Sequence, residues 1–256
     1  MNDFCSFRHE SRACIELDGN SKSVLSAAVW KSDDYRLLVT GSGDYSVRVW
    51  DLDRCELLHT LQGHSDWVRS VSTSRSYEDH PVIVSASADK SLIVWELLRG
   101  ELIHRLKGHT LMVCSVAVSQ DPLYPVIVSG SWDKTVKIWD IESGDLLRDL
   151  IGHSAPVCAV AISGGVLPVI VSGGEEDIIK VYYAMRELLR HFPSHMRGIS
   201  SVHTSHSTGA LAHIFPLKSF RPSVSATVNP RVSYRCGTSL LAPWSEPCLN
   251  ITASAE

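Results

Sequence analysis

The sequence lacks any apolar run of the roughly 18 to 20 residues that a membrane-spanning helix needs. Charges interrupt its N-terminal segment, MNDFCSFRHESRACIEL, so no secretory signal is expected, because such a signal needs a continuous apolar stretch. The seven cysteines include no C-x-x-C pair and no His/Cys cluster at zinc-ligand spacing. These absences favour a cytoplasmic protein with reduced thiols, no metal and no cofactor, with the nucleus as the alternative location.

Basic charge is scarce in most of the chain. The formal net charge is −4 over 256 residues, and from Arg186 onward seven basic residues stand against three acidic ones, so the preceding part is distinctly acidic. Phosphate contacts supply most of the affinity for nucleic acids and require a basic surface. The composition therefore argues against a large nucleic-acid interface. The 44% content of hydrophobic residues fits a soluble globular protein with one large or two modest cores.

Two sequence markers recur with one period. Gly-His pairs occur at residues 63–64, 108–109 and 152–153, in steps of 45 and 44 residues. Trp-Asp or Trp-Glu pairs at Trp50, Trp95 and Trp139 have the same two steps. Between the markers lie DYSVRVW, DKSLIVW and DKTVKIW, in which an aspartate turn leads into an alternating strand. A repeated unit of four strands is therefore predicted.

This pattern resembles that of the WD-repeat family of β-propellers, in which each repeat of about 40 to 45 residues supplies four strands to the blades of a ring. The resemblance covers residues 12–205. It implies an all-β propeller at 12–215 with four recognisable blades and a partial fifth, and leaves open whether the ring is complete. The expected repeats are 19–62, 63–107, 108–151, 152–193 and 194–215, after an extension at 1–11 and before a Ser/Pro-rich irregular tail at 216–256.

The outer repeats depart from the pattern. The first has Gly19-Asn20 in place of Gly-His, and the fourth has Glu176 and Tyr182 in place of the turn aspartate and the tryptophan. The strand before each Gly-His pair should be outermost in its blade. Residues 12–17 match ELLHTL in position, so we expect them to add an outer strand to the last blade and latch the ring. Without closure, open blade edges favour self-association.

The repeated polar residues allow two interpretations. Ser85, His64 and Asp89 have the residue types of a catalytic triad, which would suggest a hydrolase. The same set recurs in other repeats, however, and an enzyme rarely keeps a copy of one active site in every repeat. In the family such residues form a buried hydrogen-bond network, so the resemblance implies a structural role and no catalytic residue. The expected network residues are Thr40, Asp44, Trp50, His64, Ser85, Asp89, Trp95, His109, Ser129, Asp133, Trp139, His153 and Ser172.

A second set of positions varies between repeats. Trp132 precedes the turn aspartate, where other repeats have Gly43, Ala88 and Glu175, and the family places this position on the upper rim of the ring. The residues three and five after each histidine lie on the same rim in the family. Trp, Arg and Met are enriched at binding hot spots, although packing of the two tryptophans against neighbouring loops is an equal alternative. The candidate partner-binding residues are Trp67, Arg69, Met112, Trp132 and Glu175.

Together these features predict a non-enzymatic scaffold or adaptor that binds protein partners, not a membrane. A chromatin- or nucleic-acid-associated reader is the alternative. A hydrolase is less favoured, because no acid, base or nucleophile stands outside the repeated set. The segments WDLD, WELL and WDIE lack the W-D-x-R sequence that ubiquitin-ligase substrate receptors of the family often show. The fold by itself identifies no partner.

Overall fold

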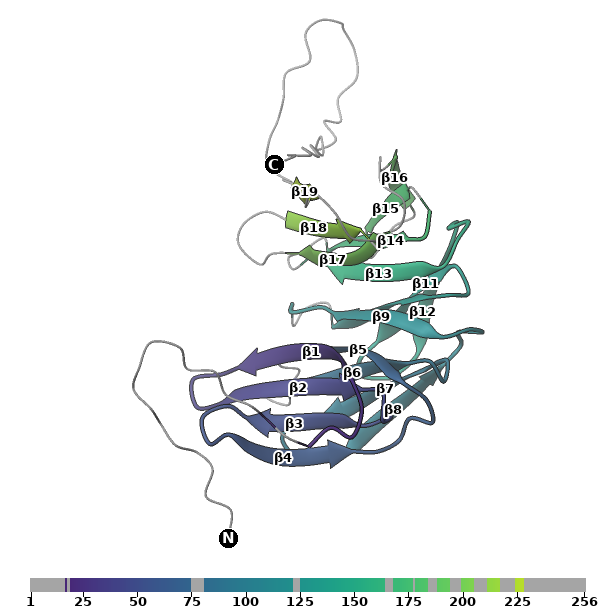
Figure 1. Ribbon diagram of the computed structural model, residues 1–256. Coiled ribbons are helices and arrows are strands. Elements are labelled where there is room, and N and C mark those ends of the chain that lie inside the picture. The colour runs from purple at the N-terminus through teal and green to yellow at the C-terminus, as the bar shows by residue number, and fades with distance from the viewer. Residues whose placement is uncertain are drawn as a thin grey trace, which may run out of the picture.

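The computed structural model describes residue 17 and residues 19–74, 81–121, 125–163, 168–176, 178–183, 188–193, 199–204, 211–216 and 224–227. These residues form the antiparallel strands β1 to β19, arranged in five sheets (Figure 1). The prediction of an all-β fold with four blades and a partial fifth is confirmed, and each sheet is called a blade below. In this part of the chain no helix is long and apolar enough to cross a membrane.

The first three blades each contain four strands in sequential order. The first blade comprises β1 (Val24–Lys31), β2 (Arg36–Ser42), β3 (Val47–Asp51) and β4 (Glu56–Leu61). The second comprises β5 (Val68–Thr73), β6 (Val82–Ser87), β7 (Ser91–Glu96) and β8 (Leu102–Lys107). The third comprises β9 (Val113–Val118), β10 (Val126–Ser131), β11 (Thr135–Asp140) and β12 (Leu146–Ile151).

The last two blades differ in strand number. The fourth comprises β13 (Val157–Ile162), β14 (Val169–Gly174), β15 (Ile178–Tyr183) and β16 (Leu188–Pro193), and the fifth comprises β17 (Ile199–Thr204), β18 (Leu211–Pro216) and β19 (Val224–Thr227). We expected residues 216–256 to be irregular, and β19 corrects this expectation at residues 224–227. This strand pairs with β18, with Val224 opposite Ile214. Because this four-residue segment contains no proline, it keeps all its amide donors despite the Ser/Pro-rich surroundings.

Neighbouring blades meet through their first strands. β1 contacts β5, β5 contacts β9, β9 contacts β13 and β13 contacts β17, and Figure 1 shows this succession from the bottom of the view to the top. The strands before each Gly-His pair, β4, β8 and β12, lie at the opposite edge of their sheets, which confirms that they are outermost. Among the described residues no comparably extensive contact joins the fifth blade to the first, so the ring is open.

The predicted latch at residues 12–17 lies outside the described residues except for Leu17, which is not part of a strand. The outer strands β4, β8 and β12 each pair within their own blade. The pairing of residues 12–17 with the last blade stays a prediction.

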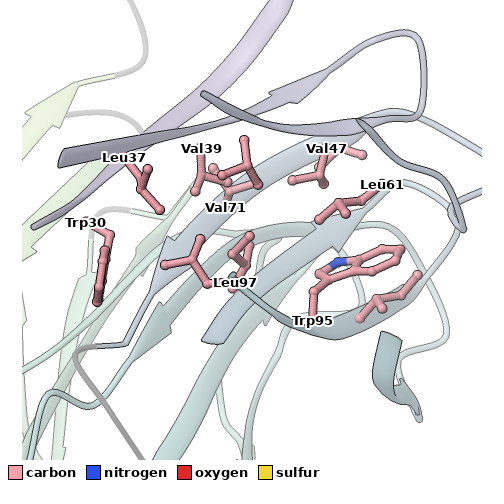
Figure 2. Close-up of a cluster of buried hydrophobic side chains, with 12 residues drawn as sticks. Trp30, Leu37, Val39, Val47, Leu61, Val71, Trp95 and Leu97 are labelled. Carbon is pink, nitrogen blue, oxygen red and sulfur yellow. The ribbon is translucent and has the colours of Figure 1, made fainter. Parts of the chain in front are cut away.

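The hydrophobic cores lie between blades. At the contact between the first and second blades, Leu37 and Val39 of β2 cluster with Val71 of β5 and Trp95 of β7 (Figure 2). The second strands β6, β10 and β14 are buried along their whole length. Successive side chains of a strand point to opposite faces, so a V-I-V segment packs against the blades on both sides. The second, third and fourth blades therefore each depend on two neighbouring blades for stability.

In the first three blades, the aspartate two residues after the second strand closes a tight turn. Asp89 Oδ1 accepts a hydrogen bond from the Ser91 amide at 2.9 Å. Lys90 between them has a positive φ of 71°, and Tyr45 and Lys134 hold the same place with φ of 75° and 69°. An aspartate that bonds its own backbone two residues on stabilises such a turn. The turn carboxylates are thereby fixed at one end of each blade.

Candidate protein-interaction rim

A buried chain of hydrogen bonds crosses the second blade. Trp95 Nε1 donates to Ser85 Oγ at 2.9 Å, and Ser85 Oγ lies 2.8 Å from His64 Nε2. His64 Nδ1 lies 2.9 Å from Asp89 Oδ2. Because the indole N–H donates to the serine, the serine O–H is free to donate to Nε2, and His64 then donates its Nδ1–H to the carboxylate. The network ties the loop before β5 to β6, β7 and their turn.

The third blade repeats this network with the same partners. His109 Nδ1 lies 2.7 Å from Asp133 Oδ2 and its Nε2 lies 2.8 Å from Ser129 Oγ, while Trp139 Nε1 donates to Ser129 at 2.9 Å. The serine-histidine-aspartate connectivity matches that of a catalytic triad. A nucleophile must reach its substrate, however, and the Ser129 side chain is fully buried beneath the indole. The geometry favours a structural role over hydrolysis.

The first blade fills the histidine position differently. Trp50 Nε1 donates to Thr40 Oγ1 at 3.1 Å, and Asn20 stands where the other blades have histidine. The Arg48 guanidinium bonds Asn20 Oδ1 at 2.5 Å and Asp44 Oδ2 at 2.9 Å. The Arg48 side chain thus joins the loop to the turn carboxylate in the blade that has no histidine at this position.

The fourth blade keeps the histidine, but other residues replace the turn aspartate and the tryptophan at the two ends of the network. Glu176 bonds His153 Nδ1 and accepts from the Ser154 amide at 2.9 Å, while His153 Nε2 lies 2.7 Å from Ser172 Oγ. Tyr182 stands in the tryptophan position, and its buried hydroxyl has no hydrogen-bond partner among the described residues. Burial raises the pKa of Tyr182 to about 12, and the nearby Ser172 hydroxyl only partly offsets this effect. A buried hydroxyl without a well-formed hydrogen bond costs about 1 to 3 kcal/mol, so this substitution is expected to weaken the blade.

The networks fix the charge states of their members. Burial alone would raise the pKa of Asp89, but hydrogen bonds from the His64 ring, a serine hydroxyl and backbone amides outweigh it and hold that pKa well below its usual range. The turn carboxylates of the other three blades have lowered pKa values for the same reason. Burial lowers the pKa of His109, which Asp133 only partly offsets. At neutral pH the carboxylates are ionised and His109 is neutral.

Each turn is joined to the loop before the first strand of its blade, and together these segments form the rim. In the second blade the Ala88 amide, just before the turn aspartate, donates to the Trp67 carbonyl in the loop at 2.9 Å. In the third blade the Trp132 amide donates to the Met112 carbonyl in the same way at 3.0 Å. The Glu175 amide makes the equivalent bond in the fourth blade at 3.1 Å. Four of the five candidate partner-binding residues therefore lie in these paired loops.

Both rim tryptophans present a large surface to solvent. Trp67 is 48% exposed and Trp132 is 40% exposed. Trp67 also leans over the first blade, because a Cβ built on Gly43 would lie 4.0 Å from Trp67 Cδ1. Packing against a neighbouring loop and exposure to solvent thus coexist at this side chain. Tryptophan is among the residue types most enriched at binding hot spots.

The other candidates lie at different depths. Met112 is partly buried and Glu175 is exposed. Arg69 lies in the wall of a central cavity of about 440 Å³, together with Cys114 and Cys158 on the first strands of the next two blades. Burial raises the pKa of Cys114 to about 11, so this thiol is protonated at neutral pH and a poor nucleophile. The described residues include no group of three His, Cys, Asp or Glu side chains suited to a metal ion.

The sequence analysis missed the serine two residues before the turn aspartate in each of the first three blades. The Ser131 hydroxyl donates to the Met112 carbonyl at 2.8 Å and accepts from the Asp133 amide at 3.1 Å. Ser42 makes the equivalent bonds in the first blade. In the second blade Ser87 accepts from the Asp89 amide and donates to the Asp66 carbonyl, one residue earlier in the loop. These serines hold the two halves of the rim together. Their recurrence in VTGSGD, VSASAD and VSGSWD was a signal available in the sequence.

Three further rim residues were not among the candidates. Leu111, next to Met112, is exposed, as is Tyr45 in the turn of the first blade. The Lys22 ammonium lies 5.3 Å from the centroid of the Tyr45 ring, which is within the range of a cation–π contact. The apolar surface of the rim is therefore larger than the two tryptophans alone indicate.

Comparison with known families agrees with this geometry. The WD domain, G-beta repeat, matches residues 12–51, 55–96 and 100–140. Those ranges contain β1–β3, β4–β7 and β8–β11, so they cover the first three blades except the outer strand β12. The strands and turn carboxylates of these blades recur at the same spacing. The chain belongs to the WD-repeat family, a class of β-propeller proteins.

Individual proteins match only parts of the chain. Ribosome assembly protein 4 of Saccharomyces cerevisiae is 38% identical over 64 residues, which are 25% of this chain and 12% of that protein. Nuclear distribution protein PAC1 of Fusarium vanettenii is 50% identical over 38 residues, or 15% of this chain and 8% of that one. The WD40 beta propeller domain of Doa1 has a TM-score of 0.62 and 26% identity, covering 77% of this chain and 62% of that one. This chain thus covers less than two thirds of each.

Proposed function

We propose that this protein is a non-enzymatic scaffold or adaptor that binds protein partners through its rim. The observation that carries the proposal is the contrast between two tryptophans of one blade. Trp139 is 1% exposed and hydrogen-bonded in the core. Trp132, seven residues earlier, is exposed at a position where other blades have Gly43 or Ala88, so the fold does not require an aromatic there. Contact with a partner gives this side chain a role.

The polar networks support a binding role over catalysis. The serine-histidine-carboxylate sets are buried and repeated, which suits stabilisation of the blades. Two similar proteins are named for ribosome assembly and nuclear distribution, and neither name describes a catalytic activity. A chromatin- or nucleic-acid-associated reader stays the alternative, but the acidic composition of the blades disfavours it.

The double substitution Trp67→Ala and Trp132→Ala is expected to reduce capture of protein partners without unfolding the chain. Truncation of a hot-spot tryptophan typically costs 2 kcal/mol or more, so we expect the recovery of true partners to fall about tenfold or more. The measurement is affinity capture from nuclease-treated lysate, quantified by mass spectrometry. Nuclease treatment also removes proteins that are held only through nucleic acid.

The matched control is Leu147→Ala, which truncates an exposed apolar side chain on the outer strand β12. This variant should capture the same proteins as the unmodified chain. The proposal would be overturned if the rim and outer-strand variants captured every protein equally well.

A further inference from the structure

The first blade presents an apolar face that its counterparts bury. A valine begins the first strand of each of the first four blades and pairs with the last residue of the second strand. Val68, Val113 and Val157 hold this position in the second to fourth blades and are 0% exposed, whereas Val24 in the first blade is 49% exposed. The same residue type at the same register position is therefore uncovered only in the first of these four blades.

The exposure continues along the strand. Val29 is 63% exposed, although its equivalents Val118 and Ile162 are buried in the cores between blades. Leu38 is partly exposed, while its equivalent Ile83 is fully buried. We call Val24, Val29 and Leu38 the first-blade face. Val29 and Leu38 are paired across two strands, and Val24 lies at the other end of β1. Three aliphatic positions that are core elsewhere in the molecule indicate a missing contact rather than ordinary surface.

The molecule itself shows what covers such a face. Val71 and Trp95 of the second blade pack against Leu37 and Val39 on the opposite face of the first blade (Figure 2). The third and fourth blades pack on the blades before them through equivalent residues. In all three cases the covering surface belongs to the preceding WD blade. The occupant that fits the first-blade face is therefore another such blade.

A hydrogen bond between neighbouring blades indicates which blade could cover the first-blade face. The Val71 amide donates to Ser26 Oγ of the preceding blade at 3.1 Å, and the Val116 amide donates to Ser70 Oγ at 3.2 Å. Ser26 and Ser70 each follow a register irregularity in the first strand of their blade. Ser201 holds this register position in β17 of the fifth blade. The fifth blade thus has the residue type that the other inter-blade contacts use.

We propose that the first-blade face binds the fifth blade, β17–β19, of a second copy of this chain. Within one chain the described contacts of β17 to other blades are with β13 and β14 of the fourth blade, and none of that extent reaches the first blade. The complementary surfaces therefore lie at the two ends of an open arc. A head-to-tail contact between copies buries the exposed valines and extends the packing already present between successive blades of the molecule.

Val29→Glu is expected to abolish this self-association. A carboxylate cannot be buried without a partner, so the apparent dissociation constant should rise about tenfold or more. Sedimentation velocity over roughly 1 to 50 µM should show the unmodified chain at a concentration-dependent mass of at least two copies. The Val29→Glu variant should sediment at the monomer mass of 28.2 kDa. It should melt at the same temperature as the unmodified chain diluted to its monomeric state, because residue 29 is exposed in the isolated chain.

Ile151→Glu is the matched control, because Ile151 is an even more exposed aliphatic residue at the end of the outer strand β12. It should associate like the unmodified chain. A monomeric unmodified chain would overturn the proposal, and so would a Val29→Glu variant that still associates or an Ile151→Glu variant that dissociates equally.

Photo-crosslinking gives a readout that does not depend on the glutamate variant folding. A photoreactive amino acid at position 29, in an equimolar mixture of ¹⁵N-labelled and unlabelled chains, should crosslink to peptides from residues 199–227 of the other isotopic form. Crosslinks to that region only within one chain would show closure of a single ring instead. Crosslinks elsewhere would place another surface on the face. Either result would overturn the proposal.

Discussion

Replacing Trp139 by alanine is expected to lower the free energy of unfolding by about 3 to 5 kcal/mol, the usual cost of truncating a large buried aromatic. The indole is 1% exposed and packs in the core between the second and third blades. It also lies against Gly108, where a Cβ would approach to 3.0 Å of Cη2. Its loss leaves a cavity and removes the N–H that donates to Ser129. Chemical denaturation monitored by circular dichroism measures the change.

Trp132→Ala is the control within the same blade. Its indole is largely outside the core, so surface truncation should change the free energy of unfolding by less than about 0.5 kcal/mol. Equal destabilisation by the two substitutions would contradict the distinction between a core tryptophan and a rim tryptophan. Unchanged stability of Trp139→Ala would contradict the network geometry.

Acidification from pH 7 to pH 3 is expected to lower the melting temperature by about 10 °C or more. The four turn carboxylates have pKa values below their usual range, and burial lowers the pKa of His109. In each case the unfolded chain binds a proton more readily than the folded chain. Protons therefore favour unfolding, first below about pH 6.5 through His109 and then below about pH 4 through the carboxylates.

Asp133→Asn tests whether the turn carboxylates cause this dependence. The variant keeps the side-chain size but cannot gain a proton at this position, so its melting temperature should be lower at pH 7 and should fall less steeply between pH 5 and pH 3. Thermal melts in matched buffers provide the comparison. Parallel curves for the two proteins would contradict a role for Asp133, and a melting temperature constant from pH 7 to pH 3 would contradict the whole assignment.

The blade architecture could be predicted because the same physical requirement recurs in each repeat. Every buried polar group needs a partner, so a turn such as that at Asp133 fixes a histidine, a serine and a tryptophan at constant spacing. That spacing is visible in the sequence as Gly-His and Trp pairs 44 or 45 residues apart. The candidate rim residues followed from the resemblance, since position in the repeat decides which side of the ring a loop occupies.

Other features depend on contacts that sequence periodicity does not encode. Arg48 on β3 takes the place of the histidine that the other blades have in the loop before their first strand. An alignment of the repeats therefore shows only that Asn20 stands in the histidine position. Val24 has the same residue type as its buried equivalents, and it is exposed because none of the described blades packs on its face. Arg69 was assigned to the rim, but its side chain lines the central cavity, because the first strands turn that register position toward the axis. The pairing of β19 likewise depends on a neighbouring strand and not on local composition.

Hydrogen–deuterium exchange with a partner obtained by rim-dependent capture tests the central claim most directly. Exchange of backbone amides reports which segments become protected when the partner binds. The account predicts slower exchange in peptides that contain Trp67, Met112 and Trp132, with no change in the outer strands β8 and β12. Protection confined to those outer strands, with unchanged exchange around the three rim residues, would contradict it.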